Sequence, residues 1–476
     1  MEPTTIASKL DQLVVCQNSQ GVEILATPLR INRYQIAFET YTPHLVLRTS
    51  EVLSDFKIRF GERVVYAGRA VVSGLVNTGA SLICEATLEE MWLDVELSPT
   101  GEEKQGLPKQ FEEFILAAQK AFQVRPEFKI VIADMQNFLM DLRGWLEQIE
   151  LGVRAQPAGD RQQSEREAIQ ELGSAIMPLL GGLFERFEEA CKGIEPDLQP
   201  AHRAYVKRQL HHLVLCAPFM YRSFRKPLGY AGDYEMVNMM VRDACEGASI
   251  FAKILNIFFL NTAPVVAHRN RISMLYQALV EETCRAKRQG RPAKVFNLGC
   301  GSAKEIQDFL SQSDLSQNAQ FTLMDFNEET VVHAEGALGE IKRKHHRTTP
   351  VQLIKKSVTQ LLKEAAKPVS VYASADYDFV YCAGLFDYLA DHVCGRLLNV
   401  FYGMLAPGGL LLVTNVDGSN PNRNWMEYSV DWNLIHRNHK QLASLRPRNA
   451  APDATCVVAE PSGVNIFLQV RKPSDA

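Results

Sequence analysis

The 476-residue chain lacks the cysteine spacing of a zinc or redox site, because its ten cysteines are scattered and form no C-x-x-C pair. Long apolar runs are also missing: Ile254–Leu260 is among the most hydrophobic stretches, yet a membrane helix needs roughly 20 apolar residues. The first residues contain no basic region followed by an apolar segment, the pattern of an export signal. We therefore expect reduced thiols, no metal site, no integral membrane segment and a cytoplasmic location.

The chain also has no large excess of positive or negative residues. The net charge is -4 and 22% of residues are charged, which indicates neither nucleic acid nor an anionic membrane as partner. The basic run Lys342–Arg347 ends a predicted helix, where the helix dipole favours cations, so we expect no nucleic-acid partner. The adjacent His211 and His212 point to different helix faces and do not indicate a metal site.

The length predicts two or three domains, since one hydrophobic core rarely serves so long a chain. Residues 1–104 read as a small all-β domain, because apolar and polar residues alternate in Tyr34–Glu39 and in Phe56–Phe60. Asn77–Gly79 suits a hairpin turn, and Leu93–Leu97 reads as a further strand. We expect a barrel.

Residues 105–290 change to a helical pattern, in which Phe111, Phe114 and Phe122 recur on one helix face. The stretch 152–160 contains proline and glycine and reads as a connection between two helices. This helical region is expected to cover the site described next.

Residues 291–476 alternate between buried-type strands and helix-like segments, which predicts a Rossmann-like α/β domain with a mostly parallel sheet. Two apolar runs at the end, Cys456–Val458 and Val464–Leu468, are expected to form an antiparallel edge. The four clearest strands are Val295–Leu298, Phe321–Met324, Phe379–Cys382 and Leu410–Val413.

A glycine turn follows the first of these strands. Gly299 and Gly301 carry no side chain that would keep a ligand from the backbone, although such a turn is weak evidence alone. Asp325 ends the second strand, where a carboxylate can accept hydrogen bonds from both ribose hydroxyls. The chain has no G-x-G-x-x-G here and no G-K-[ST], which disfavours a dinucleotide or triphosphate. Together with the Pro407–Gly409 turn before the fifth strand, these features favour a nucleoside cofactor.

The segments VFNLGCGSA, LMDFN, DYDFVYCAGLFDYL and MLAPGGLLLV, in this order, resemble the class I S-adenosylmethionine-dependent methyltransferases. The resemblance implies S-adenosylmethionine as cofactor, with Gly299 and Gly301 against its methionine part, Asp325 on the ribose and Phe326 on the adenine. Asn297 belongs to this cofactor set, at a position where an acidic residue is common. The resemblance further implies Ser357 and Val358 at the adenine edge, and Cys382, Ala383 and Gly384 on the methyl-transfer side.

The methyl acceptor decides whether a base is needed. A carboxylate is already ionised at neutral pH and needs orientation, whereas an amine or alcohol needs deprotonation. Two stretches are candidates: Arg225–Tyr234, which is alternatively a plain interhelical loop with Asp233 as N-cap, and the crossover Asn420–Trp432. Ile254–Val266 would line an acyl chain or form a core helix. The residues expected to act on the acceptor are Tyr230, Asp233, Tyr234, Arg269, Tyr388 and Trp432, with Arg271 as the alternative cation to Arg269.

The phrases EVLSDFKI, GRAVVSGLVNTG, KPLGYAGDYEMVNMM, VFNLGCGSAKE and AGLFDYL resemble bacterial 3-hydroxypalmitic acid methyl ester biosynthesis proteins, which carry a PilZ-like N-terminal domain. The resemblance implies carboxyl O-methylation of a 3-hydroxy fatty acid, giving a methyl ester used in quorum sensing. Arg30 and Arg33 lie closer together than the arginine pair of PilZ domains that bind cyclic di-GMP, and the segment around Ser73 lacks their second motif. We therefore expect an interdomain role for the β domain, or a role in a homodimer.

Two other functions stay open. One is a non-catalytic sensor of S-adenosylmethionine or an acyl ligand that acts through its β domain. The other is a methyltransferase for another acceptor.

Overall fold

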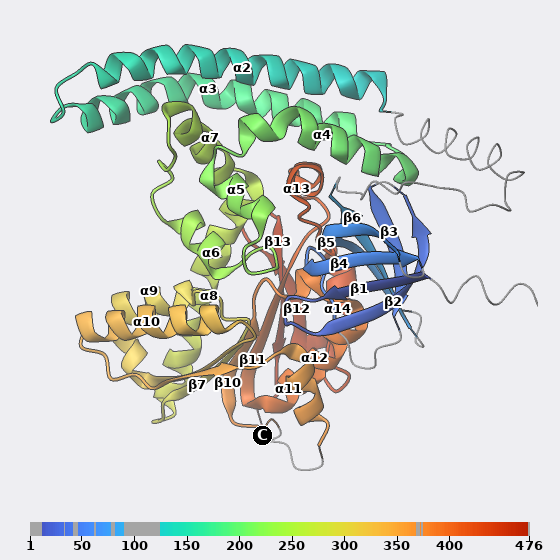
Figure 1. Cartoon of the computed structure of the whole chain (residues 1–476). Coiled ribbons are helices and arrows are strands. Elements are labelled where there is room, and N and C mark those ends of the chain that lie inside the picture. The colour runs from blue at the N-terminus through green and yellow to red at the C-terminus, as the bar shows by residue number, and fades with distance from the viewer. Residues whose placement is uncertain are drawn as a thin grey trace, which may run out of the picture.

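The structure is a computed structural model that describes residues 12–32, 34–40, 46–60, 63–77, 81–89, 124–367, 372 and 375–474. It has three parts: a β-barrel, a layer of helices and an α/β sheet (Figure 1). This arrangement confirms the predicted fold class.

The N-terminal part is a closed barrel of antiparallel strands in the order β1-β2-β3-β6-β5-β4. Its interior is apolar because alternate side chains point inward, as Ile36 and Phe38 do in β3. Two residues of the predicted hairpin turn, Thr78 and Gly79, lie outside the described residues, as do the predicted strand Leu93–Leu97 and Arg33. The strands are β1 (Gln12–Gln17), β2 (Glu23–Ile31), β3 (Gln35–Thr40), β4 (Val52–Phe60), β5 (Arg63–Asn77) and β6 (Leu82–Leu88).

The helical layer begins with two long helices that lie side by side at the top of Figure 1, α2 (Pro126–Arg154) and α3 (Arg161–Cys191). Their connection, residues 155–160, is three residues shorter than the one predicted at 152–160, because α2 continues to Arg154. The helical pattern at Phe111–Phe122 lies outside the described residues. The layer continues with α4 (Gln199–Val214), α5 (Pro218–Arg225), α6 (Tyr234–Val241), α7 (Ile250–Leu260) and α8 (Ala263–Arg288).

The C-terminal part is a seven-stranded sheet in the order β12-β13-β11-β10-β7-β8-β9. Strands β7 to β11 pair in parallel, and β13 pairs antiparallel with both β11 and β12. The predicted antiparallel edge is therefore a β13 strand inserted between β11 and the edge strand β12. The strands are β7 (Ala293–Leu298), β8 (Ala319–Asp325), β9 (Val351–Lys355), β10 (Tyr377–Cys382), β11 (Leu405–Val416), β12 (Thr455–Ala459) and β13 (Asn465–Arg471).

Helices cover both faces of the sheet, which explains why its central strands are almost continuously apolar. One face packs on α8, α9 (Lys304–Gln312) and α10 (Glu328–Lys344). The other packs on α11 (Val358–Ala365), α12 (Asp391–Met404) and α14 (His439–Ser444). The last helix, α13 (Arg423–Val430), packs instead under the helical layer, where Trp425 contacts Phe184 and Phe187.

The predicted turn Pro407–Gly409 lies inside β11 instead of before it. The pairing of β10 with β11 shifts register between Tyr377 and Phe379, and Gly408 has a φ of 76°. The Pro-Gly-Gly sequence thus makes an irregular start to a longer strand, since glycine accepts the left-handed backbone that the shift needs.

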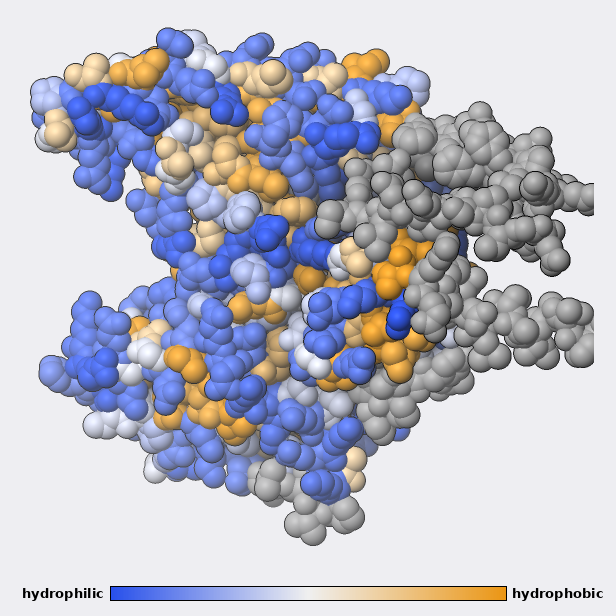
Figure 2. Space-filling view, viewed as in Figure 1, coloured by the Kyte–Doolittle hydropathy of each residue, from blue (hydrophilic) through white to orange (hydrophobic). Residues whose placement is uncertain are grey.

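The ten cysteines are all free and six of them are buried. The face seen in Figure 2 is mostly hydrophilic and is hollowed between the long helices at the top and α9–α10 below. Within the described residues no single helix is long and apolar enough to cross a membrane, and the bent pair α7–α8 passes that test by length and composition alone.

Candidate functional site

The loop after β7 ties two strand ends together. Gly299 and Gly301 have φ angles of 75° and 53°, in the left-handed region that favours glycine. The Gly299 N–H donates to the Met324 carbonyl at 2.8 Å, and the Gly301 N–H donates to Asp325 Oδ2 at 3.2 Å. Ala303 shares the left-handed conformation, with a φ of 51°, and begins α9. The loop therefore exposes backbone beside the Asp325 carboxyl.

This loop lines a cavity, the first cavity, between the sheet, the helical layer and the barrel. Among the described residues, four of its lining side chains carry a buried polar atom without a hydrogen-bond partner: Asn297 Oδ1, Ser302 Oγ, Thr49 Oγ1 and Arg48 Nε. Burial raises the pKa of the Asp325 carboxyl, and backbone N–H groups of Asn327 and Gly301 counteract this. Orphaned oxygens and a buried carboxyl beside a glycine loop fit a polar nucleoside with an amino-acid arm.

One end of the first cavity is formed around Asp325 and Phe326, the residues predicted to contact the nucleoside, and we call it the nucleoside end. Tyr230, which was expected to act on the acceptor, lies here, with its ring centroid 5.0 Å from that of Phe326. Its hydroxyl pairs with Thr330 Oγ1 at 3.3 Å, and burial raises the pKa of the phenol. Tyr230 therefore sits beside the predicted adenine position.

Of the five remaining residues of the predicted cofactor set, three line the first cavity and two do not. Val358, Ala383 and Gly384 line the first cavity. Ser357 lines an adjoining cleft and caps α11, accepting from the Gln360 N–H at 3.3 Å. Cys382 is fully buried in the sheet and does not line the cavity.

A second cavity adjoins the first and is bounded by α5, α6, α7, α8 and α13. It is mostly apolar, and part of the predicted acyl segment, from Phe259 to Val265, contributes to its wall. The two cavities share Gly232, Val237, His268, Arg271, Gly384 and Tyr388. We call this shared wall the junction.

The junction carries a buried cation. Arg271 is 9% exposed, and its Nη2 donates to His268 Nδ1 at 2.8 Å. Both Nη atoms lie 3.0 Å from where a Cβ on Gly384 would be, so this glycine makes room for the guanidinium. Burial and the Arg271 charge keep the pKa of His268 well below its ordinary value, so the imidazole is neutral.

Two of the predicted acceptor residues meet at the junction: Trp432 Nε1 donates to the Tyr388 hydroxyl at 2.9 Å. Tyr234 lines the first cavity at its rim, where its hydroxyl donates to Glu329. Asp233 is the N-cap of α6, the alternative that the sequence offered to a role on the acceptor. Its carboxylate also pairs with Arg222 at 2.9 Å.

Arg269 does not line either cavity. Its guanidinium donates to the Met240 and Leu260 carbonyls, where helices α6 and α7 end. The alternative cation, Arg271, occupies the junction instead. His268 and Arg48 also line the first cavity and had no signal in the sequence.

Residues 296–411 match the family model described as a methyltransferase domain. The chain therefore contains a methyltransferase domain, which confirms the predicted enzyme class and supports S-adenosylmethionine as the cofactor. The comparison with curated proteins found no match. Among the described residues, no cluster of histidine, cysteine, aspartate and glutamate is placed to hold a metal ion.

Solved structures resemble parts of the chain. A protein from Bordetella parapertussis described as a possible exported protein is 16% identical, with a TM-score of 0.40, over 63% of this chain and 97% of its own. Magnesium protoporphyrin IX methyltransferase from Synechocystis PCC 6803, with bound S-adenosylmethionine, is 12% identical (TM-score 0.30, 44% and 81% covered). The N-methyltransferase NodS from Bradyrhizobium japonicum WM9, with S-adenosyl-L-homocysteine, is 13% identical (TM-score 0.29, 51% and 98% covered).

Proposed function

We propose that the protein is an S-adenosylmethionine-dependent methyltransferase that methylates the carboxyl group of a 3-hydroxy fatty acid. The observation that carries the acceptor class is the junction: a buried guanidinium stands where a mostly apolar cavity meets the cavity of the glycine loop. A fatty acid combines a single anionic head with an apolar tail, and this wall offers a partner to each.

The bound cofactor would supply a methyl group on a sulfonium, which a carboxylate oxygen attacks as the carbon–sulfur bond breaks, giving the methyl ester and S-adenosylhomocysteine. The chain's own task is then alignment, which can supply roughly 7–11 kcal/mol of the barrier. Arg271 would hold the carboxylate, and Tyr388 and Trp432 would fix its position beside Gly384. The apolar wall from Phe259 to Val265 would take the tail.

The junction suits an acceptor that needs no base. His268 has a strongly lowered pKa and accepts a hydrogen bond from Arg271, so it is a poor proton acceptor. The Asp387 carboxyl lines the second cavity, where burial raises its pKa, and it accepts from the Val416 N–H at 2.6 Å. An amine or alcohol would need deprotonation before transfer, whereas a carboxylate is already ionised and pairs directly with the Arg271 charge.

The test is incubation of the purified chain with methyl-labelled S-adenosylmethionine and matched C16 acceptors: 3-hydroxypalmitate, palmitate and hexadecylamine. We expect a methyl ester by mass spectrometry, fastest with the 3-hydroxy acid. Arg271→Met, which keeps a long side chain without the charge, should raise the acceptor KM by roughly 10–100-fold. Donor binding without any product would instead support the sensor, and product from hexadecylamine alone would overturn the carboxylate assignment.

Asp325→Ala tests the donor site separately. The variant should bind S-adenosylhomocysteine at least roughly tenfold more weakly, because it loses hydrogen bonds to both ribose hydroxyls. Undiminished binding would overturn the assignment of the first cavity.

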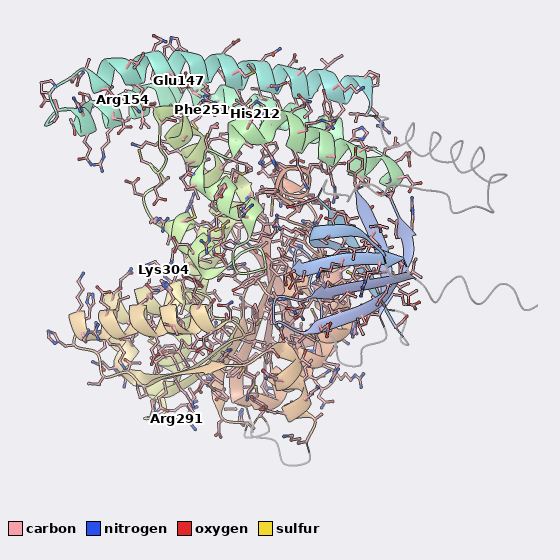
Figure 3. The ribbon with its side chains drawn as sticks, viewed as in Figure 1. Glu147, Arg154, His212, Phe251, Arg291 and Lys304 are labelled. Atoms are coloured by element: carbon pink, nitrogen blue, oxygen red, sulfur yellow. The ribbon has the colours of Figure 1, made fainter. Side chains whose placement is uncertain are left out.

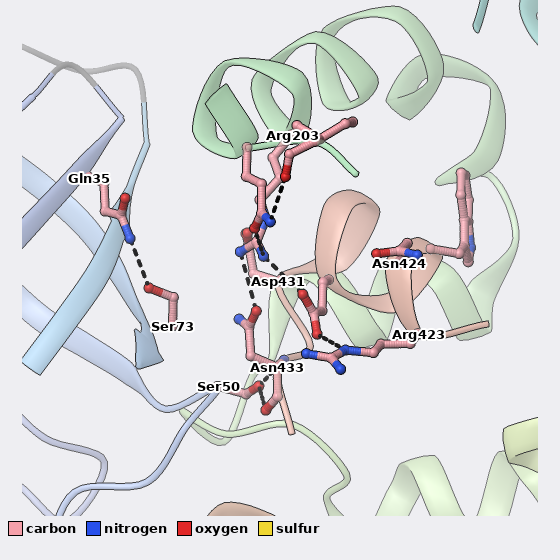
Figure 4. Close-up of polar contacts among 12 residues, drawn as sticks. Gln35, Ser50, Ser73, Arg203, Arg423, Asn424, Asp431 and Asn433 are labelled. Carbon is pink, nitrogen blue, oxygen red and sulfur yellow. Dashed lines mark hydrogen bonds and ion pairs between the residues drawn. The ribbon is translucent and has the colours of Figure 1, made fainter. Parts of the chain in front are cut away.

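We also propose that the N-terminal barrel is PilZ-like and that it joins the other two parts of the chain as an interdomain module. Its support is the closed six-strand topology and the contact of Arg30 with Asp197, 3.0 Å apart, which links β2 to the start of the α4 region. Gln35 and Ser73 hydrogen-bond to each other on the barrel wall at 3.4 Å (Figure 4). Titration with cyclic di-GMP should give no binding, and light scattering will show whether the chain forms a homodimer.

A further inference from the structure

The barrel reaches into the first cavity. Residues 46–51 lead into β4, and Val46, Arg48 and Thr49 from this segment line the same cavity as the Gly299–Gly301 loop. Gln20, between β1 and β2, lines it too. The cavity walls therefore come from the barrel as well as from the helical layer and the sheet.

Arg48 is the charged group that the barrel brings. It is 6% exposed, and its Cζ lies 4.1 Å from the Phe326 ring centroid and 5.0 Å from that of Tyr230. Its Nη2 donates to Ser19 Oγ at 2.9 Å, while its buried Nε lies 3.9 Å from Glu51 Oε2 and has no hydrogen-bond partner in the described part of the chain. A guanidinium has five N–H donors, so this one retains donors at the nucleoside end.

The segment is fixed from both sides. Glu51 is fully buried and accepts from the Arg48 N–H at 2.9 Å and from Ser19. Ser50 Oγ donates to the Asn433 carbonyl at 2.7 Å, next to Trp432 (Figure 4). The Val52 N–H donates to the Gly229 carbonyl at 2.7 Å, next to Tyr230. The position of Arg48 is thus set by the barrel and by both loops that line the cavities.

We propose that Arg48 is a donor-binding residue supplied by the barrel, and that its guanidinium covers the adenosine part of S-adenosylmethionine. This inference rests on the proposed function, which assigns the cofactor to the first cavity. The guanidinium lies over the Phe326 ring at the predicted adenine position, and an arginine side chain also interacts well with the face of a base. The Arg48 charge also favours the ionised form of Asp325, the predicted ribose ligand.

The donor site is therefore composite: the methyltransferase domain binds the methionine and ribose, and the barrel closes over the nucleoside. A purely structural arginine would give the same packing without touching the ligand, so the test must separate ligand binding from folding.

The experiment uses the full chain with Arg48→Met, Arg48→Lys and the control Arg59→Met, which changes an exposed arginine on β4. S-adenosylhomocysteine and adenosine are titrated by calorimetry, and the Tm of each variant is measured with and without ligand. Arg48→Met should weaken both ligands by the same factor, roughly 10–100-fold, and shrink the ligand-induced rise in Tm. The ligand affinity of Arg48→Lys should lie between those of wild type and Arg48→Met, since lysine keeps the charge but lacks the planar donors. Arg59→Met should bind within about twofold of wild type.

The outcomes separate the two proposals. If wild type binds S-adenosylhomocysteine and Asp325→Ala does not, yet Arg48→Met binds as wild type does, the inference about Arg48 is wrong and the proposed function stands. An Arg48→Met chain with a lower ligand-free Tm but an unchanged affinity would likewise show that Arg48 serves packing alone. A weaker affinity for S-adenosylhomocysteine with unchanged affinity for adenosine would also overturn the inference. If wild type binds neither ligand, the proposed function itself fails.

Discussion

The indole Nε1 of Trp432 donates a hydrogen bond to the hydroxyl of Tyr388 at 2.9 Å, at the point where the two cavities adjoin. Tyr388 ends a short helical turn after β10, and Trp432 follows α13. Gly232 completes the contact, because a Cβ there would lie 3.0 Å from the Tyr388 hydroxyl and 3.5 Å from the Trp432 ring. Three loops from different parts of the chain are therefore held together by this pair.

Trp432→Phe should impair methyl transfer and spare donor binding. The change removes the N–H and leaves the partly buried Tyr388 hydroxyl without its donor, which costs about 1–3 kcal/mol and loosens the junction. We expect kcat/KM for the fatty acid to fall roughly 5–100-fold, with the Kd for S-adenosylhomocysteine within about twofold of wild type. Trp145→Phe, at a half-exposed tryptophan on α2, is the control. An unchanged kcat/KM would show that the pair does not position the acceptor.

Gly384→Ala should displace Arg271. Gly384 has a φ of 82°, and a Cβ there would lie 3.0 Å from both Nη atoms of Arg271. The left-handed backbone alone costs an alanine about 1–2 kcal/mol, so the midpoint of urea unfolding should fall, and the acceptor KM should rise. Gly418→Ala, where a Cβ would meet nothing within 4 Å, should leave both unchanged. A wild-type KM in Gly384→Ala would argue against carboxylate binding by Arg271.

The site residues that follow the strands could be predicted from the sequence, because the topology of the sheet alone determines where they lie. Parallel strands end at the same edge of the sheet, so Gly299, Asp325 and Gly384 had to lie near one another once β7, β8 and β10 were recognised. The residues that the helical layer contributes to the site were harder to predict from the sequence. Arg269 and Arg271 are two positions apart on α8 and point to different faces, and only packing decides which face meets the cavity.

The sequence could not predict that Arg48 lines the first cavity, and the reason is a different one. Its place depends on how the barrel docks, through the contacts of Ser50 with Asn433 and of Val52 with Gly229. These hydrogen bonds join segments far apart in the sequence and leave no periodic pattern or spacing within either one. The barrel itself was predictable, because alternation in β3 and β4 is local.

Asp378→Asn should destabilise the sheet without touching the site. Asp378 is fully buried and pairs with Arg285 at 3.0 Å and with Arg291 at 2.6 Å. In Figure 3 Arg291 lies at the bottom of the molecule, far from Lys304, which stands beside the cofactor loop. Both guanidinium groups are partly exposed and Arg285 keeps Glu282 at 2.8 Å, so losing the Asp378 charge should cost about 1–3 kcal/mol in urea unfolding at pH 7. Asp376→Asn, at an exposed carboxylate, should cost less than about 1 kcal/mol.

The Asp378 effect should fade in acid. Burial alone would raise the pKa of this carboxyl, but hydrogen bonds from Arg291 and the Lys294 N–H hold it below its ordinary value. A lowered pKa gives stability that is complete above the ordinary value, near 4, and is lost as the pH falls through the folded-state pKa. The stability difference between wild type and Asp378→Asn should therefore shrink below about pH 4. A constant difference would show that the carboxylate charge contributes nothing.

Lys226 should make the stability of the fold depend on pH near neutrality. It ends α5 next to the Tyr230 loop, is 3% exposed, and its Nζ donates to the Val430 carbonyl at 2.5 Å. Burial lowers the pKa of the amine from 10.5 to about 7, although the Asp431 charge opposes the shift. Between these two values the unfolded chain holds a proton that the folded chain lacks, so stability rises with pH, by up to about 1.4 kcal/mol per unit. Below about pH 7 both states are protonated and this dependence disappears.

Lys226→Met isolates that dependence, since methionine has a similar length and no proton to lose. Urea unfolding between pH 6.5 and 9 should show wild type gaining stability relative to Lys226→Met as the pH rises, with the gain confined to the region above about 7. Lys440→Met, at an exposed lysine in α14, should run parallel to wild type over the same range. If the wild-type and Lys226→Met curves were parallel too, the amine would be protonated in the folded protein throughout. The buried ammonium would then be held by Asp431 and the Val430 carbonyl together, and removing Asp431 would be the change that uncovers its titration.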